Sequence, residues 1–106
     1  MTIQQAVTDL NNLMRVRIED TCTDCAAITN NLGCDGMTRR LRGIAAAANG
    51  AYSDFTPVIS ALHELEFNST LRDIPDVLEK IKMLREWLET VLLDFCNKVI
   101  ERAQKV

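Results

Sequence analysis

Apolar side chains recur every three or four residues through most of the chain, and this spacing constrains the fold more than any other feature. The first 32 residues show it at Ile3, Val7, Leu10, Met14, Ile18, Cys25, Ile28 and Leu32. An α-helix completes a turn in 3.6 residues, so this spacing places the apolar side chains on one helix face. A strand would need alternation at every second residue, and none is evident. We therefore expect an all-α fold.

The first helix is expected to end where two glycines follow Leu32 in close succession. Gly33 and Gly36 flank Cys34 and Asp35. Glycine readily adopts the left-handed conformation that terminates helices, and an aspartate side chain can cap the first amide groups of the next helix. The sequence therefore predicts a sharp turn and then a second helical segment capped by Asp35.

The second segment keeps the helical spacing but is interrupted. Its apolar positions are Met37, Leu41, Ile44, Ala48, Tyr52, Phe55, Ile59 and Leu62. Asn49-Gly50 and Pro57 interrupt this pattern, and proline lacks the backbone donor that a helix interior needs. We expect a kink between Gly50 and Pro57, with two collinear halves and Pro57 in the first turn of the second half. The alternative is a complete break at Gly50, which would give a four-helix arrangement.

A third helix is expected to open at Ile74-Pro75, after a turn at residues 68–70, and to run to the C-terminus. The three segments of about 30 residues, joined by short turns, predict an up-down-up bundle about 45 Å long. A chain of 106 residues is the usual size of one domain, so we expect a single helical-bundle domain over residues 1–106.

Composition narrows the classes of function. The formal net charge of -3 gives the chain no overall attraction for nucleic acid or anionic membranes. The sequence contains no apolar run of about 18 residues, and its first ten residues lack the features of a signal peptide. We expect a cytoplasmic protein. The alternative is a secreted protein whose signal peptide is not present in this chain, and the four cysteines and the sequon Asn68-Ser69-Thr70 fit either compartment.

The third helix is more apolar than a three-helix bundle requires. Its apolar side chains spread over roughly 200° of the circumference. Trp87 and Ile100 lie at the margins of this arc, and Leu93 lies outside it. We hypothesise that Trp87, Leu93 and Ile100 belong to the interface of a homo-oligomer. The alternative is that the kinked middle segment folds over these side chains and covers them.

The cysteines are expected to meet in one layer. In three antiparallel helices in register, Cys22, Cys25 and Cys96 would lie beside the alanine run 45–48. They would act there either as small apolar core residues or as a disulfide from Cys96 to Cys22 or Cys25. Cys22 and Cys25 also have the spacing of zinc ligands, with Cys96 as a third candidate, but a second such pair is missing. We therefore expect no metal and no cofactor.

The same register predicts a basic patch at one end of the bundle. It would bring together six residues: Arg39, Arg40, Arg42, Lys98, Arg102 and Lys105. Such a patch could bind an acidic partner or a phosphate group. The alternative is a solvated face on which the arginines pair with acidic residues of the first helix. Nucleic-acid binding is not expected, because the patch has no aromatic side chains for base stacking.

No arrangement of residues in the sequence indicates catalysis. His63 is the only histidine, it lies in a polar part of a helix, and no phosphate-binding glycine loop is present. We expect a non-enzymatic helical interaction module (an adaptor, regulator, inhibitor or assembly factor) that self-associates through its C-terminal helix. The first alternative is a secreted or surface helical protein stapled by disulfides. The second is a carrier of a metal or ligand that uses the cysteine layer.

Overall fold

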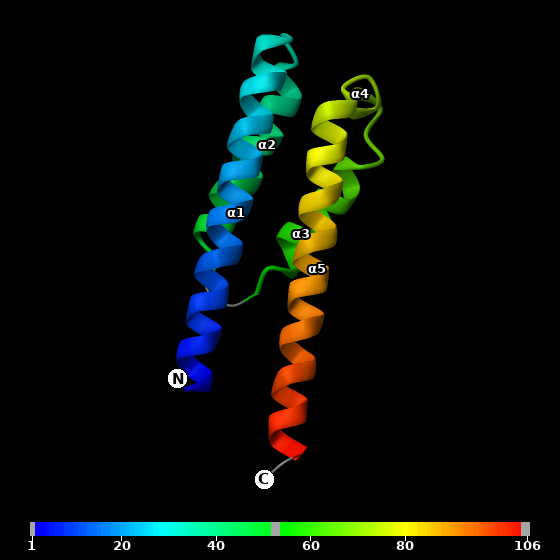
Figure 1. Ribbon diagram of the computed structural model, residues 1–106. Helices are drawn as coiled ribbons and strands as arrows, with labels where there is room; N and C mark the ends of the chain where they lie inside the picture. Colours follow the sequence, from blue (N-terminus) through cyan, green and yellow to red (C-terminus); the bar gives the residue numbers. More distant parts are fainter. Residues whose placement is uncertain (1, 52–53, 105–106) are drawn as a thin grey trace.

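The computed structural model describes residues 2–51 and 54–104, apart from the side chains of residues 99, 100 and 102–104. Over these residues the chain forms α1 (Ile3–Asn31), α2 (Asp35–Asn49), α3 (Thr56–Leu65), α4 (Ser69–Arg72) and α5 (Pro75–Gln104). The described part contains no strand, so the predicted all-α fold is confirmed (Figure 1).

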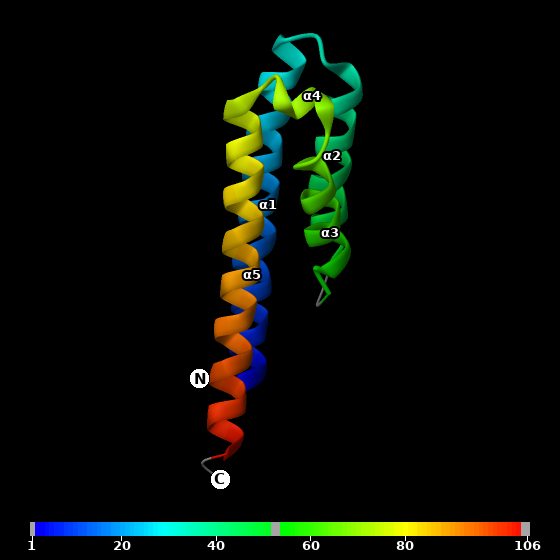
Figure 2. The ribbon, with the colours of Figure 1, turned by 90° about the vertical axis from the view of Figure 1, so that its right-hand side faces the viewer.

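The helices pack in two layers. The two long helices, α1 and α5, lie side by side and run in opposite directions, while α2 and α3 form a second layer beside only part of their length (Figure 2). The molecule is a rod with extents of 55 × 21 × 17 Å, longer than the 45 Å expected from three helices of equal length. The two layers therefore have very different lengths.

The middle segment is fully broken, so the expected collinear halves are wrong. The alternative of a complete break, with four main helices, holds, and the four-residue α4 is a fifth helix. α3 runs back along α2, and Pro57 of α3 lines the same groove as Ala47 of α2. The Asp54 carboxylate accepts a hydrogen bond from the backbone N–H of Thr56 at 3.0 Å, which starts a new helix with Pro57 in its first turn. Phe55 is 3% exposed, and its burial in the core holds the chain in this reversal.

The α1–α2 turn forms where the glycines predicted it. Gly33 has φ 76°, in the left-handed region that favours glycine, and the backbone N–H of Cys34 donates to the Thr29 carbonyl oxygen at 2.9 Å. Asp35 does not cap α2. It lies inside the first turn, where its negative charge faces the positive end of the helix dipole.

Two contacts fix how far each helix reaches along the rod. The buried hydroxyls of Thr29 and Thr38 are 2.6 Å apart. Because α1 and α2 run antiparallel, the end of α2, eleven residues after Thr38, lies level with Ile18, eleven residues before Thr29. The guanidinium of Arg17 lies over the ring of Trp87, 4.7 Å from its centroid, which brings Ile18 level with residue 86 of α5. The α2–α3 layer therefore ends near the middle of both long helices.

The core lies between the two layers and draws on all five helices. Its buried apolar residues are Met14, Ile18, Cys22, Cys25, Ala26, Met37, Leu41, Ile44, Ala48, Phe55, Val58, Leu62, Leu65, Leu71, Ile74, Val77, Ile81, Leu84 and Leu88. No helix in the described part of the chain is long and apolar enough to cross a membrane.

Candidate functional site

The most unusual feature of the molecule is a two-helix arm, which we define as residues 3–15 of α1 and 89–104 of α5. Along the rest of the rod, α2 and α3 cover the inner face of the α1–α5 layer. Beside the arm, the part of the chain that the structure describes has no such second layer (Figure 2). At 1.5 Å per residue the arm is about 20–24 Å long. Among residues 2–51 and 54–104, one face of this helix pair therefore has no neighbour.

The inner face of the arm carries half-buried apolar side chains from both helices. They are Val7, Leu10, Val91, Leu92 and Phe95. Leu10 and Leu92 pack against the core cluster, whereas Val7 and Phe95 extend beyond it. All five continue the helix faces that are buried under α2 and α3 farther along the rod. The core thus continues into the arm without the layer that would close it.

The structure places the three predicted interface residues in three different settings. Trp87 is half-buried and contacts Arg17 of α1, so it takes part in packing within the chain. Leu93 is 64% exposed and lies outside the inner face of the arm. Ile100 is on α5, and its side chain lies outside the described residues. No common surface of the three is therefore seen.

The predicted cysteine layer is not formed. Cys22 and Cys25 are buried in the core, but Cys96 is exposed on the arm, and all four cysteines are free. Lys80 of α5 lies near Cys25, and Cys96 is sixteen residues farther along the same helix, or about 24 Å. A disulfide from Cys96 to Cys22 or Cys25 is thus not present. The expectation was wrong because α3 reverses direction. As a result α5 runs antiparallel to α1, whereas three helices in register would have made it parallel.

Burial makes the two core thiols unreactive. Burial raises the pKa of Cys22 to about 12, and the neighbouring Cys25 adds to this effect. Burial also raises the pKa of Cys25 to about 11, although Lys80 opposes the shift. Because the thiolate is the nucleophile and the metal-binding form, both groups are poor candidates for either chemistry at neutral pH. Within the described residues, no three His, Cys, Asp or Glu side chains could together hold a metal ion.

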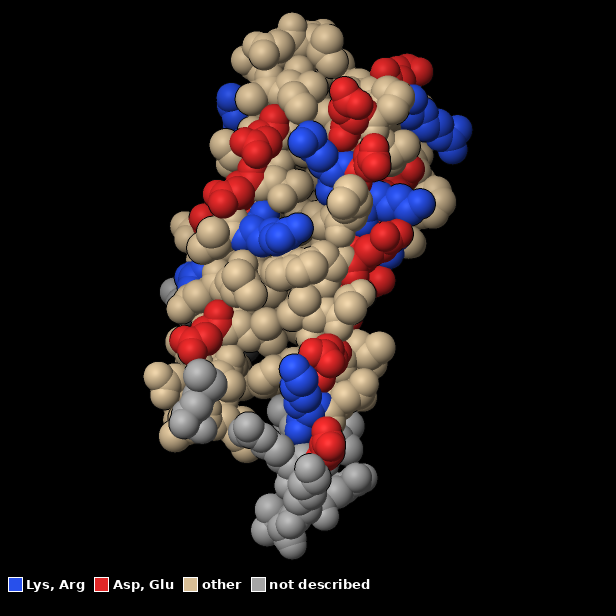
Figure 3. Space-filling view, viewed as in Figure 1, with Lys and Arg blue, Asp and Glu red and all other residues tan. Residues whose placement is uncertain are grey.

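The predicted basic patch is divided between the two ends of the molecule. Arg39, Arg40 and Arg42 follow the α1–α2 turn at one end, whereas Lys98 lies on the arm, 3.1 Å from Asp94. The side chain of Arg102 and the whole of Lys105 lie outside the described residues. The expected grouping was wrong for the same reason as the cysteine layer. Basic and acidic side chains alternate over the upper part of the visible face (Figure 3).

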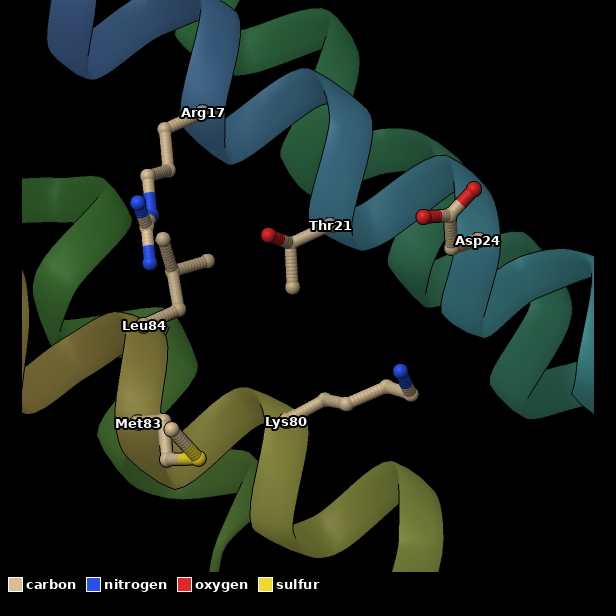
Figure 4. Close-up of a pocket in the computed structure, with 6 residues that line it drawn as sticks. All are labelled: Arg17, Thr21, Asp24, Lys80, Met83 and Leu84. Carbon is tan, nitrogen blue, oxygen red and sulfur yellow. The ribbon is translucent and has the colours of Figure 1, made fainter.

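A groove between α1 and α5 opens on the opposite, outer face. It has a volume of about 220 Å³ and is lined by Arg17, Thr21, Asp24, Lys80, Met83 and Leu84 (Figure 4). The Lys80 amine points toward the Asp24 side of the groove, while Arg17 turns toward Leu84. No buried side-chain nitrogen or oxygen in the described part of the chain lacks a hydrogen-bond partner, so no orphaned polar atom here awaits a ligand.

His63 lies at the surface, as its polar sequence neighbours predicted. Its ring is 3.6 Å from the Glu66 carboxylate and packs edge-on against Phe67. Glu66 itself is held by Arg85, which donates two hydrogen bonds to its carboxylate. This arrangement joins the end of α3 to α5, and it provides no nucleophile beside the histidine.

Sequence reasoning missed the arm because it depends on the unequal lengths of the two layers. The signal was present in part. The Gly50–Pro57 interruption divides the middle segment into two short helices, whereas the first and last segments are uninterrupted over about 30 residues. Two short helices that fold back on each other cannot cover the full length of two long ones.

The fold and the arm define this chain as a bundle of two helical hairpins, α1–α2 and α3–α5. Each hairpin pairs a long helix with a short one. Comparison with protein-family models, with curated proteins and with solved structures gives no significant match.

Proposed function

We propose that the chain is a non-enzymatic helical interaction module and that the inner face of the arm is its docking surface. The observation that carries this proposal is that no described helix forms a second layer beside the arm, where Val7, Leu92 and Phe95 continue the buried faces of α1 and α5. Packing of a helix face against another element is the usual way in which such side chains are removed from water.

The other parts of the molecule support binding rather than catalysis. The two buried thiols have raised pKa values, and His63 pairs with a carboxylate that Arg85 already holds. All four cysteines are free, which fits the reducing conditions of the cytoplasm and gives no support to a disulfide-stapled secreted protein.

Apolar residues on two sides of α5 provide a test of the docking surface. Leu92 and Leu93 have the same side chain, but Leu92 belongs to the inner face of the arm and Leu93 is exposed outside it. Because Leu92 also packs against the core, Phe95→Glu is the better disruptive variant and Leu93→Glu its control.

The experiment is affinity isolation from an extract of the native host, with the full chain, Phe95→Glu and Leu93→Glu as baits. We expect proteins, copies of this chain among them, that the unaltered chain and Leu93→Glu retain and Phe95→Glu loses. Circular dichroism checks that each bait is folded. The proposal fails if nothing is retained, or if all three baits retain the same proteins.

A further inference from the structure

We propose that the arm binds the arm of a second copy of this chain in antiparallel orientation, so that four helices close one bundle around a two-fold axis. This inference rests on the proposed function, because it names the occupant of that docking surface.

The α2–α3 layer decides the relative orientation of the two copies. It occupies the side of the α1–α5 layer toward which the inner face of the arm is turned (Figure 2). In a parallel pair with arms face to face, the long helices of the second copy would have to pass through the space that α2 and α3 fill. In an antiparallel pair they extend away from it. Only the antiparallel arrangement is free of this collision.

The arm has the length that such a pair requires. When two arms overlap fully, the tip of each reaches the end of α2 and the beginning of α3 of the other copy, where the uncovered face ends. The two-fold axis then passes the middle of each arm, which is near Asp9 on α1 and near Cys96 on α5. These two positions are level with each other in the register set by Arg17 and Trp87. The second copy thus covers the open face completely.

The charges at four positions of the arm do not oppose this pairing. At 100° per residue, Asp9 of α1 and Asp94 and Glu101 of α5 fall on the sides of their helices away from the inner face. Lys98, which pairs with Asp94, lies beside it on α5. Like charges at these four positions therefore do not meet across the interface.

The area of the face predicts a weak dimer. Two helices of about 10 Å diameter over about 20 Å give a projected face of about 400 Å². Side chains project from this plane, so the accessible area is larger than the projected area. The two copies together therefore bury about 1,000–1,200 Å², at the lower limit for specific interfaces. We expect dissociation in the micromolar range.

The two-fold symmetry predicts that the same residue of each copy meets its counterpart near the axis. An axis perpendicular to the rods packs α5 against α5 of the second copy, with Phe95 and Leu92 at the seam. Cys96 is exposed at the flank of this seam and close to the axis, so the two Cys96 thiols should be near neighbours. No other exposed cysteine lies on the described part of the arm.

The first experiment is sedimentation velocity on the purified full chain over about 1–500 μM. We expect a monomer–dimer equilibrium in which Phe95→Glu raises the dissociation constant about tenfold or more. Leu93→Glu should change it less than about twofold. Val7→Glu, on the α1 side of the face, is a second disruptive variant in case Phe95→Glu unfolds the chain. A monomer at every concentration overturns the inference. So does an effect of Leu93→Glu on the dissociation constant that is larger than the effect of Phe95→Glu.

The second experiment tests the antiparallel geometry. Diamide oxidises two thiols to a disulfide and is itself reduced to the hydrazine, so it joins only thiols that can touch. We expect rapid formation of covalent dimers that is lost in Cys96→Ser and retained in Cys34→Ser. Dimers that sediment normally but do not cross-link through Cys96 overturn the antiparallel register.

The two levels of the proposal fail separately. One outcome is that the purified chain stays monomeric while Leu93→Glu retains host proteins that Phe95→Glu loses. That result supports the docking surface but shows that a second copy of this chain does not occupy it. Loss of both results removes the docking surface itself.

Discussion

The guanidinium of Arg17 on α1 lies over the ring of Trp87 on α5, 4.7 Å from its centroid. The pair sits where the α2–α3 layer ends, so it joins the two long helices at the base of the arm. A cation over the face of an indole ring is held by the ring's quadrupole as well as by packing of the arginine stem. This contact is therefore a local reporter of α1–α5 packing.

Replacement of Arg17 by methionine should change the fluorescence of Trp87, the only tryptophan of the chain. The variant keeps an apolar stem but removes the cation, so we expect a shifted emission maximum and a loss of about 0.5–1 kcal/mol in the free energy of unfolding. Emission spectra and urea denaturation measure the two effects. Arg39→Met, far from the ring, is the control, and identical spectra for all three proteins would contradict the prediction.

Loss of the Glu66–Arg85 pair should weaken the attachment of α3 to α5. Both side chains are mostly buried, at 12% and 14% exposure, and hydrogen bonding to Glu66 raises the pKa of Arg85. Arg85→Met leaves the Glu66 carboxylate without its partner, and we expect a loss of about 2–3 kcal/mol on urea denaturation.

Glu86→Gln is the control for that variant, because Glu86 is exposed and lies 3.9 Å from Arg85. It should change the stability by less than about 0.5 kcal/mol. Equal losses for the two variants would show that the Glu66 pair has no special role.

The Thr29 and Thr38 hydroxyls should show an energetic coupling. They are buried and 2.6 Å apart, and each is also within hydrogen-bond distance of a backbone carbonyl one turn earlier in its own helix. We expect Thr29→Val and Thr38→Val each to lose stability, and the double variant to lose about 0.5–1 kcal/mol less than their sum. Strict additivity in urea denaturation of the four proteins would show that the contact contributes nothing.

The four thiols should fall into two classes of reactivity. An aromatic disulfide reagent at pH 8 is expected to modify Cys96 first and Cys34, which is half-buried, more slowly. Cys22 and Cys25 should react only after unfolding, because burial limits access and raises their pKa values to about 12 and about 11. Four reactive thiols are expected in denaturant without a reductant, and fewer would reveal a disulfide.

Alkaline pH should destabilise the fold through Cys22. Its pKa is raised from 9.0 to about 12, so between these values the unfolded chain loses the thiol proton while the folded chain retains it. The free energy of unfolding therefore falls as pH rises above 9, by up to about 1.4 kcal/mol per pH unit. The measurement is the difference between the chain and Cys22→Ala, which removes the contribution of groups that the two proteins share. The same pH dependence in both would contradict the prediction.

Local features of the fold could be predicted from the sequence. The helical spacing predicted α1, α2 and α5, Gly33 predicted the turn after α1, and Pro57 lies in the first helical turn as expected. These features depend on side chains within a few residues of each other. Whether the Gly50–Pro57 interruption bends the helix or reverses it depends on where Phe55 packs, and that is decided by residues far along the chain.

One wrong inference about direction explains the misplaced site residues. With α3 reversed, α5 runs antiparallel to α1, and so Cys96 and Lys98 move to the end of the rod opposite Arg39. The arm was missed for the same reason, since its existence requires two short helices beside two long ones.

The antiparallel course of the long helices also brings the beginning of α1 and the end of α5 to the same end of the rod (Figure 1). A linker of a few residues between them would close the chain into a ring with little loss of loop entropy. The ring could then be cut at the α1–α2 turn, and the order of the helices in the gene would change while the helices kept their packing.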